Sequence, residues 1–150
     1  MNAIGETIVF DLRGNECFGC SQERSDSLAM VFTRTAEKTV EATYSVPAAY
    51  RGMGGVVHGG FQAVLVDEAV SVAAYLFWPP ETYTVTTDLS LSYKRPVPVE
   101  QPIVVRGELL EEDEQGFRAT AAILDSSGTI LTEGAARQRK RRYRKSAAAQ

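Results

Sequence analysis

The sequence predicts an α+β fold in which one antiparallel sheet of about five to six strands wraps around a single long central helix. The first observation is the stretch 56–78, which is apolar on nearly every side. A helix of this kind is either buried inside a protein or spans a membrane. The second is that strand-like segments flank this stretch, two before it and four after it. Strands grouped around one helix, without β–α alternation, indicate an α+β layout.

The segments before the helix read as an extension followed by a hairpin. Residues 1–27 are polar and turn-rich, and we interpret them as an N-terminal extension with at most one short helix. Residues 28–35 and 39–46 are rich in β-branched and aromatic side chains with partial alternation. Such segments, joined by a three-residue turn, are typical of two paired strands.

The central helix is predicted over 56–78. The glycine-rich loop 47–55 leads into it, and Pro79–Pro80 ends it. It is too short to span a membrane and carries Asp67 and Glu68 in its middle, so burial in protein is favoured. A helix that is apolar all round needs cover on the side away from the sheet. A second subunit would supply that cover, so we expect a dimer.

The remaining strands follow the helix and alternate with turn signals rich in proline, glycine, serine and aspartate. We expect them at 83–94, 103–112, 116–125 and 129–139. The folded domain is therefore expected to span 28–139. Residues 140–150 are expected to form a basic, mobile tail.

Composition and charge narrow the classes of partner. The 150 residues, 44% hydrophobic and 23% charged, are typical of one globular domain. The N-terminus does not resemble a signal peptide, and two cysteines suit a reducing compartment, so a cytoplasmic location is expected.

Residues 137–145 supply seven of the 16 basic residues, leaving nine basic against 19 acidic residues elsewhere. An acidic body does not suit nucleic acid, and neither nucleic acid nor membrane is expected as a partner. The basic tail as an RNA-binding segment stays an alternative.

Two features of the central helix are candidates for chemistry. Burying the carboxylates of Asp67 and Glu68 costs several kcal/mol unless they are paired or functional. At the start of the helix, His58, Gly59 and Gly60 precede backbone N–H groups that lack internal partners, where the helix dipole is positive. Glycines let a ligand approach such amides closely, which is the geometry that stabilises an oxyanion. An ordinary turn is the alternative.

The spacing of these features points to two subunits. Asp67 follows His58 by nine residues, or roughly 13 Å along one helix, so one chain cannot bring both to the same atom. Two antiparallel subunits can. Glu68 points about 100° away from Asp67 and is the competing carboxylate, while Ser71, one turn on, is a donor that would satisfy Asp67 without chemistry. His58 is the only histidine, and we expect it to shape the loop by hydrogen bonds rather than act as a base.

The motif Cys17-x-x-Cys20 raises zinc and redox chemistry. Zinc sites in proteins usually have four ligands, and the sequence contains no second cysteine pair and no histidine cluster. A thioredoxin-like role requires a strand followed by a helix that opens on the motif. An ordinary turn is therefore the favoured interpretation. We expect no metal and no cofactor.

Two segments resemble a known family. GGVVHGGFQAVLVDEA at 54–69 and TVTTDLSLSYKRPVPVEQPIVVRGEL at 84–109 resemble the hotdog-fold acyl-CoA thioesterases, in the branch of the phenylacetate-pathway and 4-hydroxybenzoyl-CoA enzymes. The resemblance covers roughly 28–137, and CFGC also resembles a segment of many members. It implies a sheet wrapped around one helix, an acyl-CoA substrate, and a homodimer or homotetramer.

The resemblance also implies roles for individual residues. Asp67 would act as general base on water or as nucleophile on the thioester. The amide of Gly60 or Gly59 from the opposite subunit would polarise the thioester carbonyl, beside His58. Thr86, with Thr87 as the alternative, would place water or substrate. The residues expected to contact substrate are Gly59, Glu68, Ser71, Thr87, and Lys94 and Arg95 near the CoA phosphates.

Other functions remain open at this point. One is a non-catalytic acyl-CoA-binding or regulatory module, which has no need for Asp67 on a buried helix. Another is an acyl-chain hydratase or dehydratase, in which His58 would have to pair with a carboxylate across subunits. The acyl group is open too, because Tyr75, Phe77, Trp78 and Tyr83 suit either an acyl pocket or the core.

Overall fold

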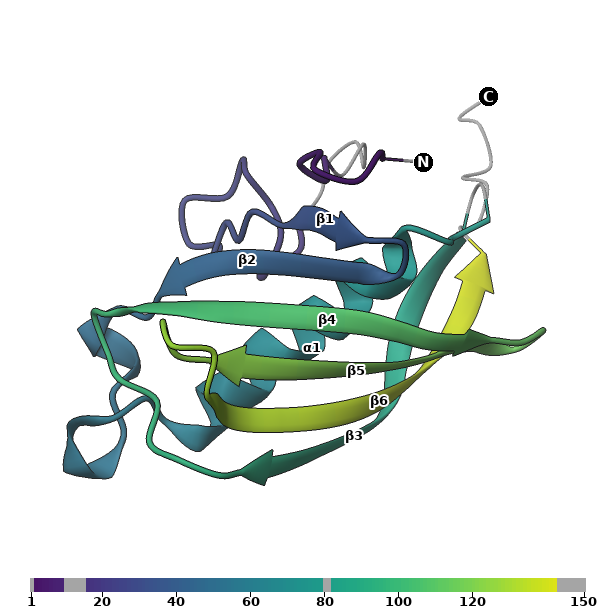
Figure 1. The fold of residues 1–150 in the computed structure, drawn as a ribbon. Coiled ribbons are helices and arrows are strands. Elements are labelled where there is room, and N and C mark those ends of the chain that lie inside the picture. Colours follow the sequence, from purple (N-terminus) through teal and green to yellow (C-terminus); the bar gives the residue numbers. More distant parts are fainter. Residues whose placement is uncertain (1, 10–15, 80–81, 143–150) are drawn as a thin grey trace.

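The computed structural model of the protein describes residues 2–9, 16–79 and 82–142. These residues form one six-stranded antiparallel sheet and one α-helix, α1 (Gly59–Tyr75), which lies against one face of the sheet (Figure 1). The strands are β1 (Thr33–Ala36), β2 (Thr39–Ser45), β3 (Thr82–Tyr93), β4 (Pro102–Glu112), β5 (Gly116–Leu124) and β6 (Ile130–Arg142). Two 3₁₀ turns, Ala48–Tyr50 and Met53–Gly55, precede α1. The predicted α+β fold is confirmed.

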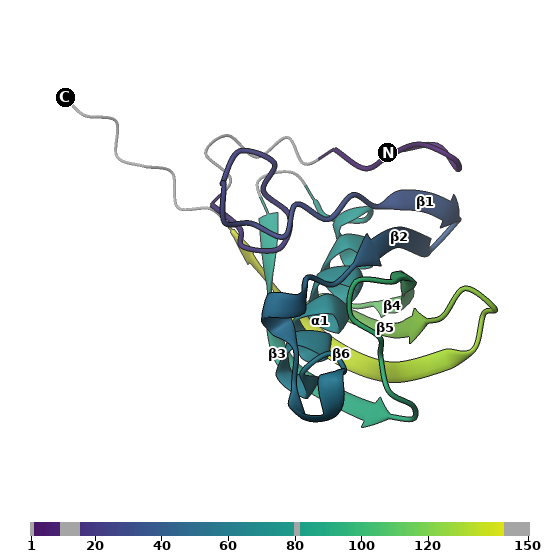
Figure 2. The same ribbon diagram turned by 90° about the vertical axis from the view of Figure 1, so that its left-hand side faces the viewer.

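The order of strands in the sheet is β1-β2-β4-β5-β6-β3. The strand that follows the helix, β3, therefore does not pair with the next strand but with the last one, β6. This places the 12-residue β3 at an edge of the sheet, with one side unpaired. Turned by 90°, the sheet is seen to curve around α1 (Figure 2).

The core lies between α1 and the concave face of the sheet. Side chains of α1 such as Leu65, Val66 and Val70 are fully buried against Val105 and Ile123 of the central strands. The sheet also contributes Gly107 at this contact, where an added Cβ would lie 2.2 Å from the carbonyl oxygen of Ala69. Glycine at that position allows the helix backbone to approach the central strand directly.

The N-terminal segment joins this core instead of extending from it. The amide of Ile8 donates to the carbonyl of Phe32 (2.8 Å), and the amides of Leu28 and Met30 donate to the carbonyls of Phe18 (2.8 Å) and Gly19 (3.2 Å). Ile8, Leu28 and Met30 are all buried. No helix forms in the described residues before β1, 2–9 and 16–32, and the segment is held by backbone hydrogen bonds and apolar packing.

Several predicted boundaries are wrong, each because a long-range contact replaces the local pattern. The strand predicted at 28–35 begins only at Thr33, since residues 28–32 hydrogen-bond to the N-terminal segment. The helix predicted over 56–78 spans Gly59–Tyr75, because Val57 donates to the carbonyl of Val97 instead of starting the helix.

The last strand is longer than predicted. The strand β6 continues to Arg142, because residues 139–142 pair with residues 82–85 of β3. The first three residues of the expected tail are thus part of the sheet, and the remainder, 143–150, lies outside the described residues. Within the described ranges, no helix has the length and apolar character needed to cross a membrane.

Candidate active site

Asp67 lies in the middle of α1 and faces β3. The hydroxyl of Thr86 donates a hydrogen bond to its Oδ1 at 2.7 Å. The other oxygen, Oδ2, has no hydrogen bond within the described part of the chain, and the side chain is partly exposed. Asp67 is therefore held in one orientation through one oxygen while the other remains available.

A buried glutamine organises the groups around Asp67. Gln138 of β6, opposite Thr86 in the sheet, is 1% exposed. Its Nε2 donates to Ser71 Oγ at 2.6 Å and to Thr86 Oγ1 at 3.4 Å, and its Oε1 accepts from Thr84 Oγ1 at 3.5 Å. Because Nε2 donates to the Thr86 hydroxyl, the proton of that hydroxyl is directed to Asp67. Every member of this Asp67–Thr86–Gln138–Ser71 network has a partner, as buried polar groups require.

The sequence analysis missed Gln138 and weighed two threonines. Gln138 stands in a strongly basic segment, and no local pattern marks it as a site residue. Thr86 reaches Asp67, whereas Thr87 is exposed and donates to the backbone carbonyl of Arg137 at 3.1 Å. Successive residues of a strand point to opposite faces. Thr87 therefore does not join the hydrogen-bond network of Asp67, and its expected contact with substrate stays a prediction.

His58 caps the N-terminus of α1. Its Nδ1 accepts from the amide of Gly60 at 3.0 Å, and its carbonyl accepts from Phe61 and Gln62. His58 thus makes the hydrogen bonds expected of a residue that shapes the loop. The N–H of Gly59, by contrast, has no acceptor among the described residues. Gly59 also approaches Tyr93, whose hydroxyl donates to its carbonyl at 3.0 Å.

An open cavity of about 420 Å³ connects this helix start with two cationic side chains. It is lined by Val56, Gly59, Gln62, Tyr93, Lys94, Arg95 and Pro96. Arg95 is exposed, and Lys94 pairs with Glu133 at 2.9 Å. The structure therefore brings Gly59, Lys94 and Arg95 together, as expected. Asp67, Thr86 and Ser71 do not line this cavity.

The two groups of residues lie along one face of the helix. Residues three and four positions apart share a helix face. The residues of α1 that stay at least partly exposed on this spacing are Gly60, Ala63, Val64, Asp67, Ser71 and Tyr75. Gly59 and Asp67 are eight residues apart, or roughly 12 Å along the axis. One chain therefore presents two half-sites on a common face of α1. One half-site is the helix start with Gly59, Lys94 and Arg95, and the other is Asp67 with Thr86 and Ser71.

Glu68 joins neither half-site. It lies against the loop that carries Cys17, whose Sγ is 3.8 Å from Glu68 Oε1. Burial, followed by the charge of Cys17, raises the pKa of Glu68 to about 8. The hydrogen bond between the two cysteine side chains, with further bonds from the Cys20 and Gly19 backbone, lowers the pKa of Cys17 to about 5 against the effect of burial. Glu68 is thus separated from the expected substrate site.

The aromatic residues at the end of α1 pack with one another and with the core. The rings of Tyr75 and Trp78 meet edge to face at 4.9 Å, and Phe77 packs against buried core residues. These contacts are those of core residues, one of the two roles considered for them, and an acyl pocket stays a prediction. A further cavity of about 660 Å³ is lined by residues that include Arg106, Glu108, Thr120 and Glu133, and Glu133 is the ion-pair partner of Lys94 in the first cavity.

Comparisons with known proteins agree with this architecture. The family model described as the thioesterase superfamily matches residues 54–132, more than half of the chain. The proofreading thioesterase EntH of Cronobacter sakazakii is 30% identical over 116 residues, which cover 68% of this chain and 82% of that protein. The acyl-coenzyme A thioesterase THEM4 of Rattus norvegicus is 30% identical over 79 residues, which cover 53% of this chain but only 33% of the rat protein.

A solved structure supports the fold independently. The thioesterase HI1161 of Haemophilus influenzae superposes with a TM-score of 0.73 at 19% identity, over 85% of this chain and 89% of that one. The expected hotdog architecture is thereby confirmed. Both of these relatives are named as thioesterases. On the match of the family model and of its relatives, the chain belongs to the thioesterase superfamily.

Proposed function

We propose that the protein hydrolyses the thioester of an acyl- or aryl-CoA to the free acid and CoA, with Asp67 as the catalytic carboxylate. The observation that carries this proposal is the hydrogen bond from Thr86 to Asp67, which orients a partly exposed carboxylate on α1 and leaves its second oxygen available. Membership of the thioesterase superfamily supports the reaction, and the name of the rat relative supports CoA as the thiol.

The complete site is proposed to form between two subunits. The 12-residue β3 presents an unpaired edge with exposed Val85 and Tyr93, and such edges pair readily with other strands. Antiparallel pairing of two β3 strands would set the partly exposed faces of two α1 helices against each other. The glycine end of one helix would then approach Asp67 of its partner. A homodimer is the smallest assembly with complete sites, and a homotetramer contains two such dimers.

In the proposed reaction, the thioester carbonyl lies near the N-terminus of one helix. The carboxylate of Asp67 either removes a proton from water as the water attacks the carbonyl carbon, or attacks that carbon itself. The carbonyl oxygen gains negative charge, which the Gly59 N–H stabilises, because the Gly60 N–H already donates to His58 Nδ1. The carbon–sulfur bond then breaks and CoA leaves as a thiolate, so no strong general acid is required. In the nucleophilic route, water then hydrolyses the anhydride between Asp67 and the acyl group, which releases the free acid and restores the carboxylate. Lys94 and Arg95 would bind the CoA phosphates.

The test is thiol release from a panel of aromatic, medium-chain and long-chain acyl-CoAs. The native protein should hydrolyse at least one of them, and Asp67→Asn should abolish the activity without loss of fold. Glu114→Gln is the control, because Glu114 is an exposed carboxylate in the turn between β4 and β5. Acyl-CoA binding without thiol release would identify a binding module instead. Hydration of an enoyl-CoA without thiol release would identify a hydratase.

The two roles of Asp67 can be separated by isotope labelling. If Asp67 is the nucleophile and water cleaves the anhydride at the Asp67 carbonyl, a single turnover in ¹⁸O-labelled water places the label on the Asp67 carboxylate and transfers an unlabelled Asp67 oxygen to the acid product. If Asp67 is a general base, the label enters only the acid product. Mass spectrometry of the peptide that contains Asp67 distinguishes these outcomes.

A further inference from the structure

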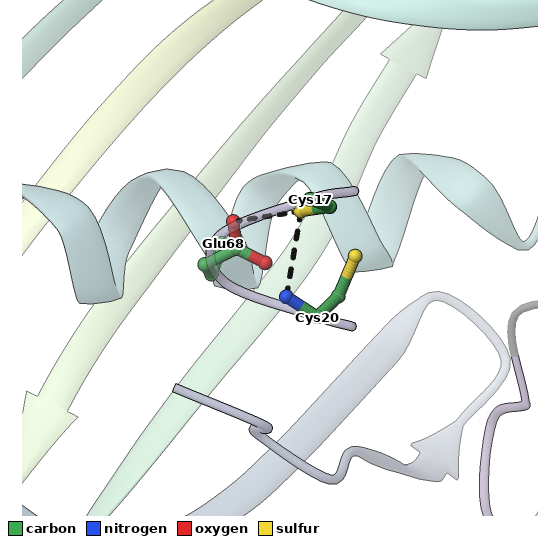
Figure 3. Close-up of side chains that lie close together, drawn as sticks. All are labelled: Cys17, Cys20 and Glu68. Carbon is green, nitrogen blue, oxygen red and sulfur yellow. Dashed lines mark hydrogen bonds between the residues drawn. The ribbon is translucent and has the colours of Figure 1, made fainter. Parts of the chain in front are cut away.

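Two cysteines and a glutamate from distant parts of the chain converge beside α1. Cys17 and Cys20 lie on a loop that passes beside Glu68 (Figure 3), although Glu68 is 51 residues further along the chain than Cys17. The Sγ atoms of both cysteines and a carboxylate oxygen of Glu68 all lie within 4.8 Å of one another. The Cys20 amide also donates to Cys17 Sγ at 3.4 Å, which joins the two ends of the motif.

The spacing of these three atoms suits a tetrahedral metal ion. Zinc binds cysteine sulfur at about 2.3 Å and carboxylate oxygen at about 2.0–2.2 Å, so the ligand atoms of a tetrahedral site are roughly 3.5–3.8 Å apart. The Cys17 Sγ to Glu68 Oε1 distance is 3.8 Å. The distances from Cys20 Sγ to the other two ligand atoms are at most 4.8 Å. A small rotation of the side chains would bring all three atoms to the spacing of a tetrahedral site. Thiolate and carboxylate donors together select a thiophilic divalent cation.

The loop is built to approach Glu68 closely. A Cβ on Gly19 would lie 1.8 Å from Cδ of Glu68, so a larger residue at this position would displace the Glu68 side chain from its place beside the loop. The Met30 amide donates to the Gly19 carbonyl, and Gly19 and Cys20 are buried. Ion pairs among the described residues do not include Glu68. Glu68 is partly buried beside two cysteines and has no cationic side chain as an ion-pair partner in the described part of the chain. A bound cation would balance the negative charge of this group of ligands.

We propose that Cys17, Cys20 and Glu68 bind one thiophilic divalent cation, Zn²⁺, and leave its fourth position to water or a small ligand. Metal binding requires both cysteines as thiolates and Glu68 as a carboxylate, and the protons that these groups still carry pass to solvent. The ion would fasten the N-terminal loop to α1, on the side of the helix that Asp67 does not occupy. Because this is a binding site for a metal and not a step in thioester hydrolysis, it stands independently of the proposed function.

The arrangement explains why sequence alone pointed to an ordinary turn. Two cysteines are too few for a zinc site, and the third ligand lies in a helix that was assigned to other chemistry. Oxidation of Cys17 and Cys20 to a disulfide is the competing fate of the motif. It requires an external oxidant and does not involve Glu68, whose Oε1 accepts a hydrogen bond from Cys17 Sγ in this structure.

The test is a titration of the full chain with Co²⁺ as a spectroscopic probe. The protein is first reduced, stripped of metal with a chelator and exchanged into metal-free buffer. We expect one Co²⁺ per chain with a thiolate-to-cobalt charge-transfer band, displacement by one equivalent of Zn²⁺, and a higher melting temperature with Zn²⁺. Cys17→Ser and Cys20→Ser should each lose stoichiometric binding. Glu68→Gln should keep the thiolate band but bind at least tenfold more weakly, since even loss of an outer-shell partner costs about 10–100-fold.

Glu23→Gln is the matched control, because Glu23 is an exposed carboxylate on the same loop and should leave binding unchanged. The substitutions conserve side-chain size, and circular dichroism verifies the fold of each variant. Absence of saturable Co²⁺ binding by the native chain overturns the proposal. Binding of native strength in the double variant Cys17→Ser/Cys20→Ser, or in Glu68→Gln, overturns the assigned ligands. A chain that binds no metal after reduction but forms a Cys17–Cys20 disulfide in air would assign the motif to redox chemistry instead.

Discussion

Asp67 and Glu68 are consecutive carboxylates on α1, yet the fold gives them opposite surroundings. Asp67 lies on the partly exposed face and accepts a hydrogen bond from Thr86, which Gln138 supports from behind. Glu68, about 100° around the helix, lies against Cys17 and Gly19 of the N-terminal loop. A carboxylate that is oriented and accessible suits catalysis, whereas one covered by thiols suits a cation. The difference arises from the elements that pack on each side of the helix.

The different roles of Asp67 and Glu68 can be tested by neutralising each carboxylate in turn. Asp67→Asn should lower kcat/KM for the best acyl-CoA by about 10²–10⁴-fold, the usual contribution of a positioned acid–base group. Glu68→Gln should change kcat/KM by no more than a few fold, because Glu68 lies outside both half-sites. Steady-state thiol release measures both values. Equal losses in the two variants would contradict the assignment of separate roles.

Gln138→Leu tests the network that orients Asp67. The substitution nearly conserves volume but leaves the Ser71 and Thr84 hydroxyls without their amide partner. We expect a loss of about 1–3 kcal/mol in the free energy of unfolding, the penalty for unsatisfied buried polar groups. Activity should fall as well, since the Thr86 hydroxyl loses its donor. Urea denaturation and thiol release measure the two effects. Gln115→Leu, at an exposed turn, is the control.

The two adjacent threonines of β3 provide a matched pair. Thr86→Val should lower kcat by about tenfold, or about 1.4 kcal/mol, the scale of one hydrogen bond to a charged group. Thr87→Val should have little effect, because Thr87 is exposed and bonds only to the Arg137 backbone. Both variants keep the β-branched shape of the side chain. A larger effect for Thr87→Val would reverse the assignment.

Asp113 is a third carboxylate, which unlike Asp67 and Glu68 is exposed to solvent. A hydrogen bond from Arg137, with further bonds from the Gln115 and Gly116 amides, lowers the pKa of Asp113 to about 2. The pKa is lower in the folded state than the ordinary value of 3.8. Its stabilising contribution is therefore complete above about pH 4 and is lost as the pH falls toward 2.

Asp113→Asn should give the smallest of these effects, because exposed charge pairs are screened by water and salt. We expect a slightly lower melting temperature than native at pH 7 and a smaller difference near pH 2. Thermal unfolding followed by circular dichroism at both pH values measures this. A difference that stays constant with pH would mean that the Asp113 carboxylate is not the source of the stability.

Much of the fold follows from local patterns. The apolar run around Asp67 predicts the central helix, and the alternation in 83–94 predicts the long strand that became β3. The paired segments 54–69 and 84–109 were sufficient to indicate the thioesterase family. These features are readable because helix and strand periodicity, and short motifs, reside in neighbouring residues.

The parts that were missed depend on residues that are distant in sequence. The pairing of Thr86 with Gln138 requires β3 to lie beside the last strand, and the start of α1 at Gly59 depends on a backbone contact between Val57 and Val97. The position of Glu68 beside Cys17 depends on how the N-terminal loop packs on the helix. Local periodicity thus accounts for the elements and for Asp67 as a candidate. Long-range strand register and loop packing decided which side chains surround each carboxylate, since those contacts exist only once the chain has folded.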